Sequence, residues 1–170
     1  GTLFLCAGGG DGSLSGCNPI GSGWQGFNLI IGARDWNRDG HPDIIARAVN
    51  GDLLYYGGDG GAGWTIPGVK IAGGWDRYDV VTGVGDWSGD GHPDVLARTP
   101  DGDLWEWEGS GASPPASAWK TGVPVKIGTG FGGYDVIAPG SWDGDRFPDL
   151  LLRAAAGRLP VRGGHGARGG

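Results

Sequence analysis

Three loops in this sequence bring oxygen-bearing side chains together at a fixed spacing. The loops span residues 35–43, 86–94 and 141–149, and the first two are near copies of each other. In each loop oxygen-bearing side chains occupy positions 1, 3, 5 and 9, separated largely by small or flexible residues. Ca²⁺ is a hard cation that binds six to eight oxygen atoms at about 2.3–2.6 Å, so it suits such a loop. The spacing therefore predicts metal binding.

The first two loops are expected to bind Ca²⁺, and the third to bind it weakly or not at all. In the third loop Ser141 replaces the first carboxylate, and Arg146 stands where the other loops have glycine. The alternative for all three is an Asp- and Gly-rich turn without metal. The candidate side-chain ligands are Asp35, Asn37, Asp39 and Asp43 in the first loop, Asp86, Ser88, Asp90 and Asp94 in the second, and Asp143, Asp145 and Asp149 in the third.

The segments around the loops predict strands. An aliphatic run follows each loop, at 43–47, 94–98 and 149–153, and is typical of a strand leaving the loop. The dipeptides at 50–51 (Asn-Gly) and 101–102 (Asp-Gly) then predict tight hairpins, because both residue types tolerate a positive φ. A third strand, a variable Gly-, Pro- and Ser-rich loop and a fourth strand complete the repeat. One repeat is thus a four-stranded antiparallel meander, which is the unit of a propeller blade.

The fold class expected is all-β, with β-propeller-type blades in about three repeats. Glycine and proline make up 51 of the 170 residues, and their recurrence at repeat spacing indicates turns rather than low complexity. Three blades are too few for an ordinary propeller, so we expect a homo-oligomer or part of a longer repeat array. The single domain is divided into 1–26 (strands completing a blade), 27–77 (first repeat), 78–133 (second repeat), 134–156 (partial third repeat) and 157–170 (degenerate tail).

The net charge of −6 says little about partners, because nine of the 19 acidic residues lie in the three loops. Outside them, 11 basic residues face 10 acidic ones, which leaves a small positive charge. The tail 157–170 is basic and resembles RGG segments of nucleic-acid-binding proteins. A solvated, degenerate final repeat is the preferred interpretation, and nucleic acid is not an expected partner.

The two cysteines, Cys6 and Cys17, predict a secreted protein. They lie close together in the glycine-rich N-terminal stretch, so a disulfide is favoured over two free thiols in a reducing cytosol. Loops of this calcium type also suit extracellular calcium concentrations. The sequence has no apolar run of about 20 residues that could span a membrane, and no signal peptide is visible at Gly1, which indicates a mature or cleaved chain.

The repeated motif resembles the FG-GAP or VCBS repeats of integrin-alpha-type β-propellers, especially those of secreted bacterial proteins. The matching residues are Asp-x-Asn/Ser-x-Asp-Gly-His-Pro-Asp, then an aliphatic strand and Asn/Asp-Gly, present twice in register. The resemblance covers nearly the whole chain. It implies that each loop lies between the first two strands of a blade and binds calcium, with the backbone carbonyls of His41 and His92 as further ligands.

The expected function is that of a calcium-binding recognition module. Among its candidate ligands a glycan comes first, which would make the module lectin-like. Trp64, Trp107 and Trp119 are candidates to stack on sugar rings; Trp64 and Trp119 lie in loops of variable length. The alternatives are an accessory or catalytic domain of an extracellular carbohydrate-active enzyme, and a protein-adhesion module. Catalysis has little support, because the sequence shows no zinc-ligand spacing, nucleophile elbow or phosphate loop. Glu106 and Glu108 form only a weak acid–base pair.

An arginine recurs after the strand that follows each loop. Arg47, Arg98 and Arg153 hold this position in the three repeats. They could line an anion site, but an ion pair from one blade to the next is the preferred interpretation.

Overall fold

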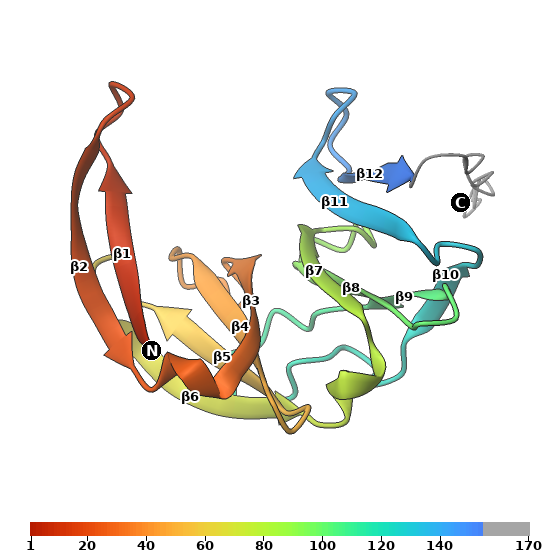
Figure 1. Cartoon of the computed structure of the whole chain (residues 1–170), viewed down its shortest axis with the longest axis horizontal. Coiled ribbons are helices and arrows are strands. Elements are labelled where there is room, and N and C mark those ends of the chain that lie inside the picture. The colour runs from red at the N-terminus through yellow and green to blue at the C-terminus, as the bar shows by residue number, and fades with distance from the viewer. Residues whose placement is uncertain (155–170) are drawn as a thin grey trace. The chain divides into compact units, whose positions relative to one another are not determined.

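The computed structural model describes residues 1–154, which form strands joined by turns and two short 3₁₀ helices. The predicted degenerate tail, 157–170, lies outside the described residues. Two compact units divide the chain. Unit 1 comprises Gly1–Asp76 and Gly111–Ala118, and unit 2 comprises Arg77–Ser110 and the chain from Trp119 onward. Each unit contains one four-stranded and one two-stranded antiparallel sheet (Figure 1).

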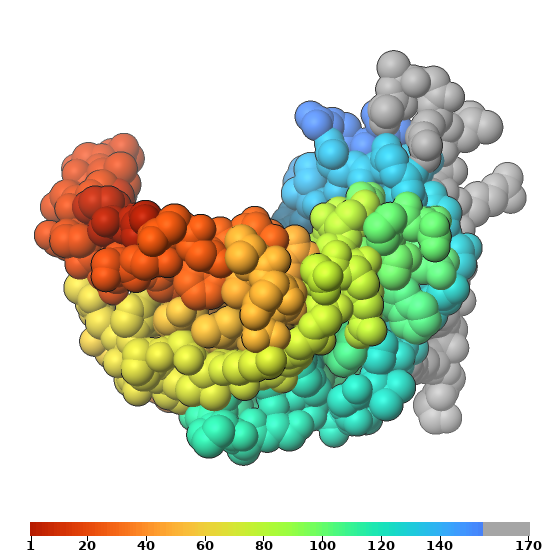
Figure 2. Space-filling model, turned by 60° about the horizontal axis from the view of Figure 1, so that its bottom comes forward, coloured from red at the N-terminus to blue at the C-terminus, as the bar shows by residue number. Residues whose placement is uncertain are grey.

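Unit 1 holds the first six strands. Its two-stranded sheet is β1-β2, and its four-stranded sheet has the order β3-β4-β5-β6. Figure 2 shows β6, in yellow, along the outer edge of this unit. The elements are β1 (Thr2–Gly8), β2 (Leu14–Ser22), the 3₁₀ helix η1 (Trp24–Gly26), β3 (Phe27–Arg34), β4 (Asp43–Ala48), β5 (Leu53–Gly58) and β6 (Trp64–Ala72).

Unit 2 repeats this arrangement in the opposite order. A four-stranded sheet with the order β10-β9-β8-β7 comes first, and the two-stranded sheet β11-β12 follows. The elements are η2 (Trp75–Arg77, which begins in unit 1), β7 (Val80–Gly85), β8 (Asp94–Arg98), β9 (Leu104–Trp107), β10 (Val125–Gly128), β11 (Tyr134–Gly140) and β12 (Asp149–Ala154).

The two four-stranded sheets confirm the predicted meander. Each has consecutive strands as neighbours, and all their pairings are antiparallel. The tight hairpins form where the Asn-Gly and Asp-Gly dipeptides predict them. Gly51 and Gly102 have φ of 83° and 89°, a conformation that glycine adopts without steric cost. Each loop with metal-ligand spacing in these sheets joins the first strand to the second, which is the position that the family resemblance implied.

Burial follows the strand pattern. In β5, Leu53 and Tyr55 are fully buried and alternate with half-exposed residues. All five residues of β8 are buried, as expected for an inner strand of a covered sheet. In unit 2 the core is formed by Val84, Leu96 and Leu104, and it is covered by half-buried side chains that include Trp87, Phe131 and Leu150.

The recurring arginine links strands within a blade. Arg98 donates to both carboxylate oxygens of Asp79, at 3.0 and 2.8 Å, across the β7–β8 pair. Its Nη1 also donates to the carbonyl oxygen of Phe131, at 2.9 Å, in the segment that follows β10. The expected ion pair between blades is therefore wrong in this case. The ion pair lies inside one blade, and backbone carbonyls accept the bonds to the next segment.

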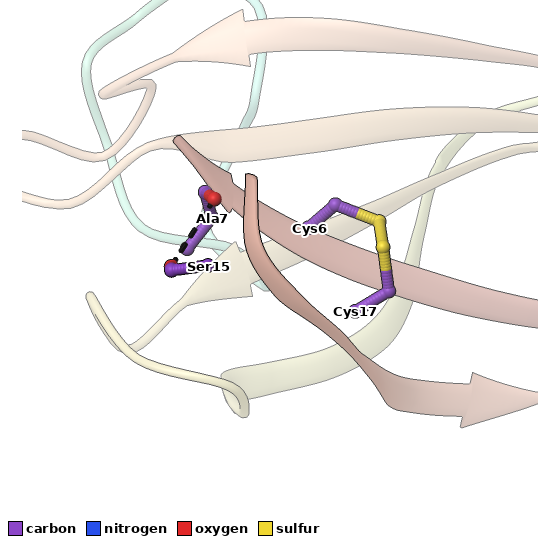
Figure 3. The surroundings of a disulfide bond; sticks show 4 residues. All are labelled: Cys6, Ala7, Ser15 and Cys17. Atoms are coloured by element: carbon purple, nitrogen blue, oxygen red, sulfur yellow. Dashed lines mark hydrogen bonds between the residues drawn. A yellow bond between two sulfur atoms is a disulfide. The ribbon is translucent and has the colours of Figure 1, made fainter. Parts of the chain in front are cut away.

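The predicted disulfide is confirmed. Cys6 and Cys17 lie directly opposite each other on β1 and β2 and are bonded (Figure 3). The Ser15 hydroxyl also donates to the carbonyl oxygen of Ala7, at 3.2 Å. This hairpin has few buried side chains, so the disulfide is a main constraint on its register.

Candidate metal centres

The carboxylate at position 9 anchors each of the first two loops. Asp43 begins β4 and is 2% exposed. Its Oδ2 accepts the amides of Trp36 and Asn37, at 2.8 and 3.3 Å, and its Oδ1 accepts the Gly58 amide at 2.9 Å. Burial raises the pKa of Asp43, although these amides act in the opposite direction. Asp43 thus ties the start of the loop to the end of β5.

Asp94 has the same role in the second loop. It is 1% exposed, and its Oδ2 and Oδ1 accept the amides of Ser88, at 2.8 Å, and Gly109, at 2.9 Å. Burial raises the pKa of Asp94 to about 6, and the two amides partly offset that effect. The structure therefore gives position 9 a role in holding the backbone, whether or not a metal binds.

In the first two loops, the carboxylate at position 1 has one oxygen without a hydrogen-bond partner. Asp35 Oδ2 accepts the Gly40 amide and Asp86 Oδ2 accepts the Gly91 amide, both at 3.0 Å. The second oxygen, Oδ1, of both side chains is buried and has no hydrogen-bond partner. A buried carboxylate oxygen without a donor is costly. A cation bound in the loop would remove that cost.

Positions 3 and 5 complete the oxygen set in the first loop. Asn37 Oδ1 accepts the Asp39 amide at 3.1 Å, and Asp39 Oδ1 accepts the His41 amide at 3.0 Å. Within residues 1–154, no three His, Cys, Asp or Glu side chains converge closely enough to form a metal site by themselves. Calcium also takes amide, hydroxyl and carbonyl oxygens. The all-oxygen set and the unpartnered Oδ1 atoms of Asp35 and Asp86 fit this ion.

The third loop has similar anchoring but differs at two positions. Asp149 Oδ2 accepts the Trp142 amide at 2.6 Å and the Asp143 amide at 3.4 Å. At position 1, the Ser141 hydroxyl is turned to the carbonyl oxygen of Asp145. At position 6, Gly40 and Gly91 have φ of 92° and 88°, whereas Arg146 does not adopt a positive φ. The loop is exposed to solvent from 141 to 147, and the weaker site expected here stays a prediction.

A lysine from a later segment of the chain contacts the second loop. Lys120 Nζ lies 2.8 Å from Asp90 Oδ2, at position 5, and 2.9 Å from Glu108 Oε2. Burial acts to raise the pKa of Asp90, but the Lys120 ammonium and the His92 amide hold it below its ordinary value. In the first loop, Asp39 Oδ2 instead accepts the Asn37 amide nitrogen at 2.9 Å. The carboxylate at position 5 therefore contacts a cation in the second loop and only a neutral amide in the first.

The aromatic residues predicted to bind a ligand lie in two different surroundings. Trp107 and Trp119 are both 7% exposed, and their rings are in contact with centroids 5.3 Å apart. Trp64 is half-buried, and its indole N–H donates to the carbonyl oxygen of Ile20 at 2.9 Å. Its ring lies 5.4 Å from that of Tyr56. Of the three, only Trp64 presents appreciable surface.

Two glycines that sequence reasoning missed belong to the loops. Gly58 and Gly109 donate to Asp43 and Asp94, and each lies 15 residues after the aspartate it contacts. A Cβ at Gly58 would lie 2.2 Å from the carbonyl oxygen of Pro42, so only glycine fits there. The equal spacing in both repeats was the signal that could have identified them. Lys120 offered no such signal, because it lies in a loop whose length varies between repeats.

The weak acid–base pair proposed from sequence does not form a shared site. Glu106 is 4% exposed on β9, and Glu108 pairs with Lys120. These two glutamates therefore have different surroundings.

Comparison with known proteins identifies the repeat. A family profile described as FG-GAP-like repeat matches residues 35–97, which include the first two loops. The chain is 28% identical over 146 residues to integrin alpha-7 of Homo sapiens and 27% identical to that of Mus musculus. Each match covers 78% of this chain and 12% of the integrin, so the chain spans about an eighth of the length of these relatives. No solved structure gives a significant match.

No helix among residues 1–154 is both long and apolar enough to cross a membrane. The profile match spans both loops and the strands from β4 into β8. Residues 35–97 thus match an FG-GAP-like repeat, and the all-β fold has four-stranded antiparallel sheets like the blades of a β-propeller.

Proposed function

We propose that the chain is an extracellular recognition module whose first two loops bind Ca²⁺ and whose ligand is a protein. The buried, unpartnered Oδ1 atoms of Asp35 and Asp86 carry the calcium part of this proposal. The Cys6–Cys17 disulfide and the similarity to integrin alpha-7 support an extracellular location. That similarity, with the burial of Trp107 and Trp119, favours a protein over a glycan ligand.

The residues that would hold the ion are the side chains at positions 1, 3, 5 and 9 and the carbonyls of His41 and His92. Bound Ca²⁺ would supply positive charge to a loop that otherwise crowds three carboxylates into nine residues. Asp43 and Asp94 already orient each loop through backbone amides. The role of the ion would be structural, because it would fix the turn between the first two strands of a blade.

Replacing Asp39 with alanine tests the calcium sites. We expect the melting temperature to fall by roughly 5 °C in millimolar calcium and to change little in EDTA, because only the calcium-bound form loses a ligand. Differential scanning calorimetry in the two buffers provides the measurement. The matched control is Asp145→Ala, at the same position of the third loop, which should show no calcium-dependent difference. Equal losses for Asp39→Ala in both buffers would count against metal ligation.

Lys120 should weaken the second site. Its ammonium contacts Asp90, so Ca²⁺ must compete with it for that carboxylate. We expect Lys120→Gln to raise calcium affinity at this site about two- to fivefold, since an exposed ion pair is weak. Titration calorimetry measures the change. Lys126→Gln, which removes an ion pair with Asp103 away from the loop, should leave affinity unaltered; a decrease for Lys120→Gln would contradict the competition.

Glycan recognition is the second candidate, and the half-buried ring of Trp64 is the observation that favours it. One experiment distinguishes protein recognition from glycan recognition. The full chain, in calcium and in EDTA, is tested against a panel of purified extracellular proteins and against a glycan panel. Calcium-dependent binding to a protein, unchanged in Trp64→Ala, supports the first candidate. Glycan binding that Trp64→Ala abolishes would favour the second instead.

A further inference from the structure

Two arginines at the first loop have an uncommon backbone conformation. Arg34, the last residue of β3, directly precedes the loop, and Arg38 is at position 4 of it. Their φ angles are 55° and 64°. Among residues 1–154 they are the only residues other than glycine with a positive φ. A side chain in this left-handed region crowds its own backbone, so the conformation is costly to the fold.

The other two loops have glycine at both of these places. In the second loop, Gly85 and Gly89 have φ of 84° and 78°. In the third loop, Gly140 and Gly144 have φ of 90° and 84°. All three loops thus turn through the same two left-handed positions, and only the first loop has side chains there. Glycine would be the more stable residue at 34 and 38.

No contact within the described part of the chain compensates for this cost. Both arginines are exposed, and neither guanidinium has a hydrogen bond, an ion pair or a ring contact there. Every other described arginine has one: Arg47 with Asn28, Arg77 with Tyr78, Arg98 with Asp79, Arg146 with Phe147 and Arg153 with Asp135. The side chains of Arg34 and Arg38 are therefore available to a partner.

A calcium ion would change the charge of this surface. Residues 34–43 contain three aspartates and two arginines, so their net charge is −1 without metal and would be +1 with one bound Ca²⁺. The corresponding residues 85–94 contain three aspartates and no arginine, and would stay at −1 with a bound ion. Of these two loops, only the first would become cationic. This step rests on the calcium site proposed above.

The chemistry of the two side chains indicates what they would bind. A guanidinium is planar and can donate two parallel hydrogen bonds to one carboxylate. Asp35 and Asp39 alternate with the two arginines, so the loop carries separated positive charges rather than a continuous basic patch. Separated charges suit an acidic peptide, in which carboxylates alternate with neutral groups, better than a densely sulfated glycan.

We propose that Arg34 and Arg38 form a contact surface for an acidic segment of the protein partner, and that calcium in the first loop strengthens this contact. Each guanidinium binds a Glu or Asp carboxylate of the partner. The ion offsets the repulsion that Asp35 and Asp39 exert on those carboxylates. Binding, rather than folding, then accounts for arginine at two positions where glycine is more stable.

A fluorescein-labelled peptide of alternating glutamate and serine probes this surface. Fluorescence anisotropy with the full-length chain in millimolar calcium measures its affinity. Arg34→Asn/Arg38→Asn should weaken binding about tenfold, because two charged contacts are lost. Asparagine tolerates a positive φ, so the loop should keep its shape. Arg77→Asn, which removes an exposed arginine outside the loop, should leave the affinity unaltered.

A second double variant, Arg34→Gly/Arg38→Gly, separates binding from folding. It should bind the peptide as weakly as the asparagine variant does. Its melting temperature in EDTA should nevertheless rise by about 2–4 °C, because glycine relieves the left-handed conformation of a larger residue. Differential scanning calorimetry measures the change. A fall in melting temperature would show that the arginines serve stability, and would contradict the proposal.

The binding experiment has two results that would overturn the proposal. One is equal affinity of the peptide for the unaltered chain and the asparagine variant, or no binding in calcium. The other is binding of a heparin-type sulfated oligosaccharide, but not of the peptide, since this would assign the surface to a glycan. The calcium site is judged separately. Peptide binding that needs both arginines, but is equally tight in EDTA, would support the surface and count against an ion in the first loop.

Discussion

Replacing Asp94 with alanine should lower the free energy of unfolding by about 2–3 kcal/mol in EDTA, and by more in calcium, where a ligand of the proposed site is also lost. The side chain is 1% exposed and accepts the amides of Ser88 and Gly109. Without it, both amides lose their acceptor. Burial disfavours the charge and raises the pKa of Asp94 to about 6, but the loss of two backbone anchors outweighs the relief of that cost. Urea denaturation in both buffers measures the effect.

Two variants make this result specific. Asp94→Asn keeps one acceptor oxygen and should lose about half as much. Asp149→Ala removes the same position from the exposed third loop, where water can replace the carboxylate, and should cost under about 1 kcal/mol. A loss for Asp94→Ala that appeared only in calcium would contradict the role of this carboxylate as a backbone anchor.

Replacing Arg98 with methionine should cost a similar amount, about 2–3 kcal/mol. Methionine keeps the apolar stem but removes the donors to Asp79 and to the carbonyl oxygens of Phe131 and Tyr134. The guanidinium is almost wholly buried, so water cannot reach those carbonyls easily. The loss should appear in thermal and in urea denaturation.

The matched control for Arg98 is Arg77→Met. Arg77 is exposed and stacks on the Tyr78 ring at 4.9 Å, so its replacement should change stability by under about 1 kcal/mol. Equal effects of the two substitutions would mean that the bonds of Arg98 to the segment after β10 contribute little to stability.

The strands and turns could be predicted because they depend on local residue patterns that repeat. The glycines at 51 and 102 need a positive φ, and the aliphatic runs after the loops need burial, so both features are visible in the sequence. The spacing of the loop residues also predicts oxygen ligands for a metal, and this stays a prediction. The unpartnered Oδ1 atoms of Asp35 and Asp86 are the observation that supports it.

Contacts that depend on long, variable loops could not be predicted. Lys120 reaches Asp90 across 30 residues of sequence, and the loop that carries it has no counterpart of equal length in the first repeat. The contact between Trp107 and Trp119 has the same origin, so residues that were expected at a ligand surface are buried. The ion pair of Arg98 was wrongly expected between blades. The repeated sequence gives the position of the arginine, but it does not show which carboxylate and which backbone carbonyls lie near it in the fold.

One titration tests the two proposed calcium sites. Chelator-treated, full-length chain is titrated with CaCl₂ in a calorimeter, and the stoichiometry is compared with that of a double variant, Asp35→Ala/Asp86→Ala. We expect saturable binding of two ions per chain, one in each of the loops 35–43 and 86–94, and loss of both in the variant. Absence of saturable binding at millimolar calcium, or equal binding by the variant, would contradict the account.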